Sequence, residues 1–444
     1  MKFIKNTVIL ITLITLPAIA LSQERGEISR ERGEYVETID KTYKVGKGGT
    51  LKLSSDEGSI RIISWHEDKV RVIAIKRADV RNRSSAEEIL EEIEVRIVKS
   101  GKDITVTGRT PWRRRRRSSS LSFEVTVPFR YNINLETDGG SIRIADLEGN
   151  VKANTEGGSI KVGQIENGNV DISTAGGSIK IDGIKNGNGN AKTAGGSIKV
   201  GDVSGNLSVE TSGGSIRFGK ITGKAYGRTS GGSIKVEESG EDLDISTSGG
   251  SISVNQAKGP IRVSTSGGSI SIGDTDGDVY AKTAGGSIHI GNAGGEVEAQ
   301  TAGGSISVDG SKGPVMVETA GGSIEVLNAR GFIEAETAGG DIEAEMIVSD
   351  KKTDTHVNLE TAGGDITLYL PGDLAATFDI ELEITRRAWR DYKIYSDFPL
   401  TISDDDDDWR GDKIIIGRGD INGGGDRIRI STTNGDIRIK KIRR

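Results

Sequence analysis

The chain lacks cysteine and has few prolines and aromatics: 0 cysteines, 7 prolines and 4 % aromatic residues in a length of 444. Without cysteine there are no disulfides, and no lipid can be attached through an N-terminal cysteine. Glycine is abundant, at 63 residues, but a collagen helix would also need abundant proline and glycine at every third position. The net charge of −6 gives no general argument for binding nucleic acid or an anionic membrane. Stability must therefore come from packing.

Long apolar runs are also scarce, and the one that occurs is N-terminal. Residues 1–22 begin with the basic "MKFIKN", continue through the apolar "TVILITLITLPAIAL" and end among the small residues Ala18, Ala20 and Ser22. This order is typical of a cleaved signal peptide, with a retained N-terminal anchor as the alternative. No later stretch approaches the roughly 20 apolar residues of a membrane span. We expect an extracytoplasmic mature chain without a transmembrane segment, in the periplasm, at the cell surface or secreted.

Glycine pairs recur along residues 131–370 at a nearly constant interval. They begin thirteen times, at spacings of 18, 19 and 19 residues, then eight of 18 and one of 24. The added residues fall in "IENGN", "IKNGN" and the longer "EMIVSDKKTDTH". Insertions at turns between fixed strand segments are typical of stacked coils.

Each unit reads approximately G-G-S-I-x-V-x-x-φ-x-G-x-V-x-V-x-T-A, with two segments in which apolar and polar residues alternate. A period of two predicts half-buried strands, and a coil of two short strands buries little unless it stacks on its neighbours. The sequence therefore predicts an all-β fold, a parallel β-solenoid of thirteen coils of about 18 residues, for which we favour right-handed coiling. Its inner column is Ile142, Ile160, Ile179, Ile198, Ile216, Ile234, Ile252, Ile270, Ile288, Ile306, Ile324, Ile342 and Ile366.

Three further columns are expected to form the corners of the coils. The glycines suit bends that need positive φ. The threonine column, Thr137 to Thr361, is expected to face inward and to hydrogen-bond along its own stack. The serine column, Ser141 to Ser323 and then Asp341 and Asp365, is expected to hold the turn.

Both flanks of the solenoid are predicted to be β-rich. Residues 23–130 form an N-terminal region in which "DEGSIRIISW" is similar to a decayed repeat, and "SSAEEILEEI" predicts a short helix capped by Ser84 or Ser85. Residues 371–444 form a C-terminal region with an acidic loop at 404–408 and a final coil in "TTNGDIRIKKIRR".

The chain resembles a bacterial extracytoplasmic family labelled "putative adhesin". The resemblance rests on "VTVPFRYNINLETDGGSIRI", the serial "TAGGSI" units, "FPLTI" and the ending "INGGGDRIRISTTNGDIRI". It covers nearly all of the mature chain. It implies a β-solenoid domain at the cell envelope, of uncharacterised function, and supplies no catalytic residues.

Several specific sites are disfavoured by the repeat pattern. A phosphate-binding loop needs glycines that lead into a helix, whereas these lead into a strand. Calcium-binding rolls need the aspartate of G-G-x-G-x-D, which "GGSIKV" lacks, and an ice-binding face needs paired threonine columns. A polysaccharide-cleaving enzyme needs unlike charged groups gathered on one face, whereas His66, His289 and His356 are far apart in sequence. We expect no cofactor, no metal and no catalysis.

Three short segments are interpreted as surface structure. "WRRRRR" at 112–117 and the aspartates at 404–408 are expected to be solvated loops. Arginine clusters beside an aromatic can bind nucleic acid, but the expected export of the chain argues against that role. The "RGD" at 418–420 matches an integrin-recognition triplet, and we interpret it as a coincidence of three residues.

One outer column carries a graded charge. The residue after each inner isoleucine is basic in six consecutive coils, then serine or histidine, then glutamate. Like charges about 4.8 Å apart are mildly unfavourable, which salt reduces. We predict that this basic stripe binds an anionic envelope polymer or the acidic end of another molecule; the alternative is that it only keeps the rod soluble. The stripe is Arg143, Lys161, Lys180, Lys199, Arg217 and Lys235.

The sequence therefore favours an exported, non-catalytic β-solenoid that is a structural or adhesive element of the bacterial cell envelope. Its partners would be envelope polysaccharide or another surface protein. An envelope-stress or signalling accessory that binds a protein partner is the alternative, and a carbohydrate-active β-helix enzyme is less favoured.

Overall fold

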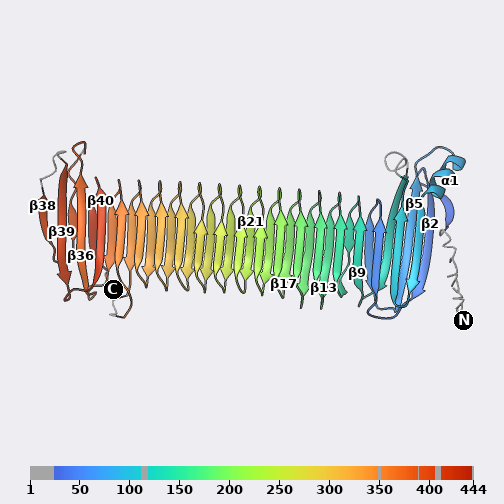
Figure 1. Cartoon of the computed structure of the whole chain (residues 1–444), viewed down its shortest axis with the longest axis horizontal. Helices are drawn as coiled ribbons and strands as arrows, with labels where there is room; N and C mark the ends of the chain where they lie inside the picture. The colour runs from blue at the N-terminus through green and yellow to red at the C-terminus, as the bar shows by residue number, and fades with distance from the viewer. Residues whose placement is uncertain (1–24, 112–118, 349–351, 389, 406–411, 443–444) are drawn as a thin grey trace, which may run out of the picture.

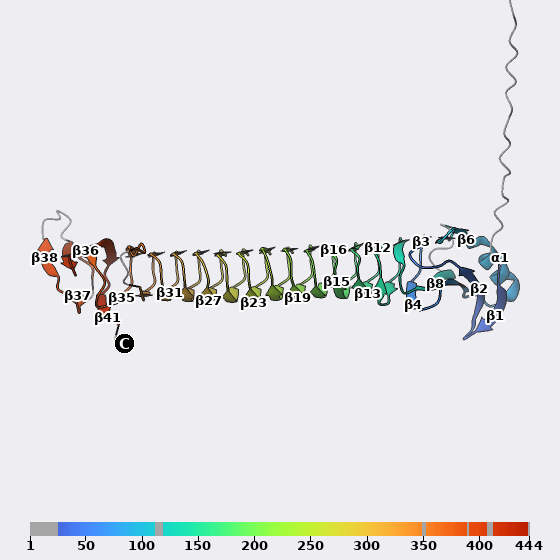
Figure 2. The ribbon, with the colours of Figure 1, turned by 90° about the horizontal axis from the view of Figure 1, so that it is seen from below.

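The computed structural model of the chain is a straight rod of two β-sheets that face one another along its length (Figure 1, Figure 2). The structure describes residues 25–111, 119–348, 352–388, 390–405 and 412–442. The expected signal peptide, the arginine run at 112–117 and residues 406–408 of the acidic segment lie outside these ranges. Successive coils pair strand by strand in parallel, which confirms the all-β solenoid class. Right-handed coiling stays a prediction.

One sheet, here sheet A, starts as four antiparallel strands and continues as parallel strands through the coils. Its strands are, in spatial order, β1 (Glu27–Glu31), β2 (Glu34–Lys44), β5 (Lys69–Ala78), β8 (Ser119–Pro128), β4 (Ile60–Trp65), β10 (Ile142–Ile144) with β11 (Leu147–Glu148), β13 (Ile160–Glu166), β15 (Ile179–Lys185), β17 (Ile198–Val203), β19 (Ile216–Ile221), β21 (Ile234–Ser239), β23 (Ile252–Ala257), β25 (Ile270–Thr275), β27 (Ile288–Ala293), β29 (Ile306–Ser311), β31 (Ile324–Ala329), β33 (Ile342–Met346), β35 (Ile366–Leu370), β41 (Ile437–Lys441) and β37 (Ile394–Ser396).

The opposite sheet, sheet B, carries the second strand of every coil. Its strands are, in spatial order, β6 (Glu94–Ser100), β7 (Asp103–Arg109), β3 (Thr50–Ser55), β9 (Asn132–Thr137), β12 (Val151–Thr155), β14 (Val170–Thr174), β16 (Gly189–Thr193), β18 (Leu207–Thr211), β20 (Ala225–Arg228), β22 (Leu243–Ser246), β24 (Ile261–Ser264), β26 (Val279–Lys282), β28 (Val297–Thr301), β30 (Val315–Thr319), β32 (Ile333–Thr337), β34 (Val357–Thr361), β40 (Asp426–Thr433), β36 (Ala376–Ile384), β39 (Lys413–Ile421) and β38 (Thr401–Asp405).

The inner isoleucines form the predicted column in the space between the sheets. Ile198 pairs with Ile179 on one side and Ile216 on the other, and each is 1 % exposed. Burying one isoleucine stabilises the fold by roughly 1.5–3 kcal/mol, so a slip of one residue, which would turn this column to solvent, is strongly disfavoured. The register of the coils is therefore set by the core.

In most coils the glycine pairs are required because successive corners stack closely, and not because the backbone needs a positive φ. Gly140 has φ +110°, but no positive φ is recorded for the pairs from Gly157 to Gly364, so the expectation of positive φ was wrong there. A Cβ on Gly158 would lie 2.0 Å from the carbonyl oxygen of Gly140 in the coil before. The second glycine of each pair is thus needed because the backbones of successive corners touch.

The threonines face inward as predicted, but the expected bonds along their own stack are not the ones that form. Thr193 Oγ1 donates to the carbonyl oxygen of Gly177, the second glycine of the preceding coil, at 2.8 Å. Thr211 does the same with Gly196 at 2.8 Å. The hydroxyl therefore satisfies a carbonyl at the corner and links adjacent coils across it.

The N-terminal region closes one end of the rod with antiparallel strands. Its β4 pairs in parallel with β10, placing Ile60 beside Ile142, so the decayed repeat is a coil of the solenoid. The helix α1 (Arg83–Glu92) lies on this cap (Figure 1). Its cap is Asn82, whose side chain accepts from the Ser85 N–H at 2.8 Å, and not Ser84 or Ser85 as the sequence suggested.

The C-terminal region closes the other end. Strands β40 and β41 pair with β34 and β35 and add a further coil, while β36, β39 and β38 form an antiparallel hairpin system on sheet B. Asp404 belongs to β38 and pairs with Lys413 at 2.8 Å, so the acidic segment begins in a strand and not in a loop. The RGD triplet lies in β39. The terminal regions thus cover both ends of the coil stack, where an exposed strand edge could pair with another chain.

Candidate functional site

The basic stripe is one continuous row on the outer face of sheet A. Arg143 pairs with Lys161 and Lys161 with Lys180, and the row continues without a gap through Lys199, Arg217 and Lys235. All six side chains are exposed. The structure therefore brings together every stripe residue predicted from the sequence.

The row has a seventh member that sequence reasoning missed. Arg61 of β4 lies in register beside Arg143 and is exposed. Its guanidinium lies 3.6 Å from Glu124 on β8, the next strand toward the cap. The signal was present in "DEGSIRIISW", but more than seventy residues separate this coil from the next one in the chain.

Most of the row is not neutralised by ion pairs. Lys180 contacts Asp182 at 2.6 Å and Lys235 contacts Glu237 at 3.6 Å. For the other four predicted members, no ion pair is found within the described part of the chain. These four cations are Arg143, Lys161, Lys199 and Arg217.

Three further acidic residues near the stripe are held by groups outside it. Asp146 Oδ1 accepts the Gln164 backbone N–H at 2.7 Å, and Asp202 Oδ1 accepts that of Lys220 at 2.9 Å. Glu238 lies between Lys220 and Lys258, each at 3.1 Å, and hydrogen bonds from these lysines lower its pKa. These three carboxylates therefore link adjacent coils.

Beyond Lys235 the same column loses its charge and then reverses sign. It runs through Ser253, Ser271, His289 and Ser307 to Glu325 and Glu343. The Ser307 hydroxyl donates to Glu325 at 3.1 Å. The second acidic column, Glu318, Glu336 and Glu360, lies in register on sheet B. Both faces are therefore acidic in the coils of residues 318–360, after which the column on sheet A continues with Thr367 and Arg438.

The serine column forms a ladder beside the stripe. Each serine N–H donates to the hydroxyl of the serine one coil earlier, for example Ser197 to Ser178 at 3.3 Å and Ser215 to Ser197 at 3.2 Å. Carboxylates replace the hydroxyls at the C-terminal end, where Asp365 N–H donates to Asp341 at 2.8 Å. This ladder holds the turn, as the sequence predicted.

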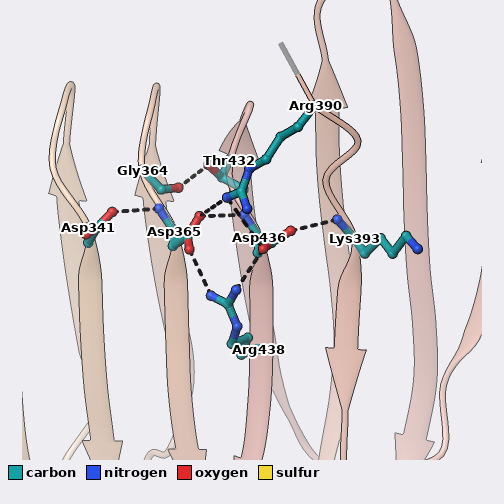
Figure 3. A network of polar contacts seen from close by, with 8 residues as sticks. All are labelled: Asp341, Gly364, Asp365, Arg390, Lys393, Thr432, Asp436 and Arg438. Carbon is teal, nitrogen blue, oxygen red and sulfur yellow. Dashed lines mark hydrogen bonds and ion pairs between the residues drawn. The ribbon is translucent and has the colours of Figure 1, made fainter. Parts of the chain in front are cut away.

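Two arginines close the end of the ladder (Figure 3). Arg438 donates through Nη1 to Asp365 at 2.8 Å and through Nη2 to Asp436 at 2.7 Å. Arg390 lies 3.6 Å from each of the same carboxylates. We call these four residues the terminal clasp. It joins the last coil of the repeat to the C-terminal region.

The terminal clasp lowers the pKa of one of its two carboxylates, Asp365. Burial raises the pKa of Asp365, but hydrogen bonds from Arg438 and from the Asp436 N–H, with the charges of both arginines, outweigh burial and hold the pKa below its usual value. Asp436 Oδ1 also accepts the Lys393 N–H at 3.0 Å. All of these groups are used in joining coils, which indicates a structural role.

His356 is the histidine with the most contacts. Its ring stacks on Phe332 with centroids 4.3 Å apart, and its nitrogens lie 2.8 Å from Asp354 and 3.4 Å from Glu334. Burial lowers its pKa, but the two carboxylates outweigh burial and raise it. His66 and His289 lie on other coils and do not join it.

Within the described ranges, no group of three or more His, Asp and Glu residues is arranged to hold a metal ion. In the same ranges, no helix combines the length and apolarity needed to cross a membrane.

Comparison with known proteins finds a family model described as Toastrack DUF4097, which matches residues 50–259 and 233–386. A solved structure described as a putative adhesin from Bacteroides fragilis is 14 % identical, with TM-score 0.22, over 64 % of this chain and 96 % of that one. A putative cell adhesion protein from Clostridium sporogenes is 9 % identical, with TM-score 0.15, over 91 % of this chain and 100 % of that one. No match was found among proteins with curated descriptions.

Proposed function

Since the chain belongs to the Toastrack DUF4097 family, a family of β-solenoid domains, we propose that it is an exported, non-catalytic rod of the bacterial cell envelope. Its role is structural or adhesive, and its partner is an anionic envelope polymer bound along the basic stripe. The observation that carries this proposal is the unbroken register of six cations, extended to seven by Arg61.

A linear polyanion fits this row because the polymer and the row both carry charged groups that repeat along one axis. The cations are spaced by one strand, about 4.8 Å, so a row of seven spans roughly 29 Å. An extended chain of carboxylates or phosphates can contact several of them at once, and each cation near an anionic surface contributes on the order of 1 kcal/mol. A row of like charges is unfavourable for the free rod, and a bound polyanion removes that repulsion.

The proposal is tested by electrophoresis of the full chain through gels that contain polyphosphate or polygalacturonate, at several salt concentrations. The variant Lys161→Ser, Lys180→Ser, Lys199→Ser should bind at least tenfold more weakly at low salt, and its affinity should depend less on salt. The matched control is Lys152→Ser, Lys192→Ser, Lys282→Ser, which removes the same charge from sheet B. Equal weakening by both variants would show that net charge, and not the stripe, is responsible.

A further inference from the structure

A separate feature lies on the outer face of sheet B, away from the basic stripe. Two hollows lie end to end there and share Asp242 and Asp244 among their lining residues. Tyr226 lines one hollow and Tyr280 the other. We call the two hollows together the tyrosine groove.

The key side chains of the groove stand in one column. Tyr226 pairs with Asp244, Asp244 with Arg262, and Arg262 with Tyr280. The tyrosines are therefore three strands apart, about 14 Å along the rod. Both are half-buried, so each ring rests on the sheet and still faces solvent. Two such platforms in line suit an elongated ligand that lies along the rod axis.

The charges of the groove are partly engaged with one another. Lys224 Nζ contacts Asp242 at 2.8 Å, and Asp278 accepts the Glu296 N–H at 2.9 Å. The Arg262 guanidinium lies over the Tyr280 ring, 4.7 Å from its centroid. The position that an incoming cation would take on this ring is thus already filled.

This arrangement discriminates between ligand classes. The lining carries five carboxylates against Lys224 and Arg262, which disfavours a polyanion. The Arg262 guanidinium already lies over the Tyr280 ring, which disfavours a second cation at that ring. What remains is a surface of aromatic rings, carboxylate acceptors and nitrogen donors, which matches the apolar C–H faces and the hydroxyls of an uncharged sugar.

We propose that the tyrosine groove binds an uncharged oligosaccharide, with one sugar ring packed on Tyr226, another packed against the stacked pair of Tyr280 and Arg262, and hydroxyls bonded to Asp244 and Arg262. The same rod then holds two partners on opposite faces, an anionic polymer on sheet A and a neutral glycan on sheet B. The glycan site does not depend on the stripe.

The test is calorimetric titration of the full chain with neutral oligomers of glucose, mannose, galactose, xylose and N-acetylglucosamine, from disaccharides upward. At least one series should bind, and affinity should rise with length until the oligomer reaches both tyrosines. Tyr226→Ala and Tyr280→Ala should each weaken binding about fivefold or more, and the double variant should abolish it.

Two controls separate this proposal from others. Tyr369→Ala changes a half-buried tyrosine on sheet A, where Lys440 lies 5.4 Å from the ring centroid, and it should bind sugar as the unchanged chain does. The stripe variant should also bind sugar normally, even if it loses polyphosphate. The proposal is overturned if no series binds, or if the double tyrosine variant binds unchanged. It is equally overturned if polylysine binds instead and Asp244→Asn removes that binding.

Discussion

At the scale of single residues, the two glycines of a pair have different surroundings. A Cβ on Gly157 would meet nothing closer than 3.9 Å, whereas one on Gly158 would lie 2.0 Å from the Gly140 oxygen. Gly158→Ala should therefore separate two corners and destabilise that coil by about 1–3 kcal/mol, while Gly157→Ala should be tolerated. Hydrogen exchange of residues 151–166 measures the difference, and equal protection in the two variants would contradict it.

The threonine hydroxyl is a second test at this scale. Thr229 is 2 % exposed and donates to the Gly214 oxygen at 2.8 Å. Thr229→Val keeps the shape but leaves that carbonyl without its donor, which should cost about 1–3 kcal/mol of local stability. Ser230→Ala, an exposed neighbour, should change stability by less than about 0.5 kcal/mol. Local exchange is the appropriate measurement, because coils of a repeat rod can open separately.

His356 gives a prediction about pH. Its pKa is raised in the fold, so protonation stabilises the segment 354–357 at the start of β34 at a pH below the ordinary histidine value of about 6.5. That contribution is lost as pH rises through the raised folded value. The protection factors of residues 352–361 should therefore fall as pH rises from about 6.5 through the raised folded pKa. His356→Gln should remove the pH dependence; an unchanged dependence would assign it to another group.

At the scale of elements, the terminal clasp determines how the last coils hold together. Removing Arg438 takes away the hydrogen-bonded charge partner of Asp436, whose side chain is 6 % exposed, and leaves only Arg390 at 3.6 Å. Arg438→Gln should weaken the pairing of β41 with β35 by about 1–3 kcal/mol, and Arg429→Gln, an exposed arginine on β40, should not.

The clasp also predicts a loss of stability in acid. The pKa of Asp365 is lowered in the fold, so its contribution is present above the ordinary aspartate value of about 3.9 and is lost as pH falls through the lowered folded value. Exchange at β41 in a series of acidic buffers should show this loss in the unchanged chain. In Arg438→Gln the loss should shift to higher pH, and no shift would contradict the account.

Elements also show what the sequence could and could not predict. Period-two alternation determines which face a residue occupies, so the isoleucine column and the stripe were predictable to the residue. Alternation does not reveal which acceptor a hydroxyl finds, and the threonine bonds were therefore missed. Arg61 and the clasp were missed because their partners are far apart in sequence. Arg61 pairs with Arg143, and Asp365 and Arg438 of the clasp are 73 residues apart. Only the folding of the two terminal regions brings these residues together.

At the scale of the whole molecule, a rod with two sheets presents long rows of side chains at a fixed spacing. Sheet A carries a row of cations in its first coils and two glutamates, Glu325 and Glu343, in later coils of the same column. Sheet B carries the tyrosine groove. Because the backbone ladder sets the same spacing for every row, the binding that we propose depends on the order of residues along a column and not on composition. The net charge of −6 therefore gives no indication of the row of seven cations.

The most direct test of this claim moves the stripe without changing the charge of the chain. The variant Lys161→Ser, Lys180→Ser, Lys199→Ser is combined either with Ser253→Lys, Ser271→Lys and Ser307→Lys in the same column or with Ser173→Lys, Ser246→Lys and Ser264→Lys on sheet B. Affinity for polyphosphate at low salt is then measured for both. The account predicts that the first combination, which continues the row from Arg217 and Lys235, restores binding and the second does not. Equal affinity of the two proteins would contradict it.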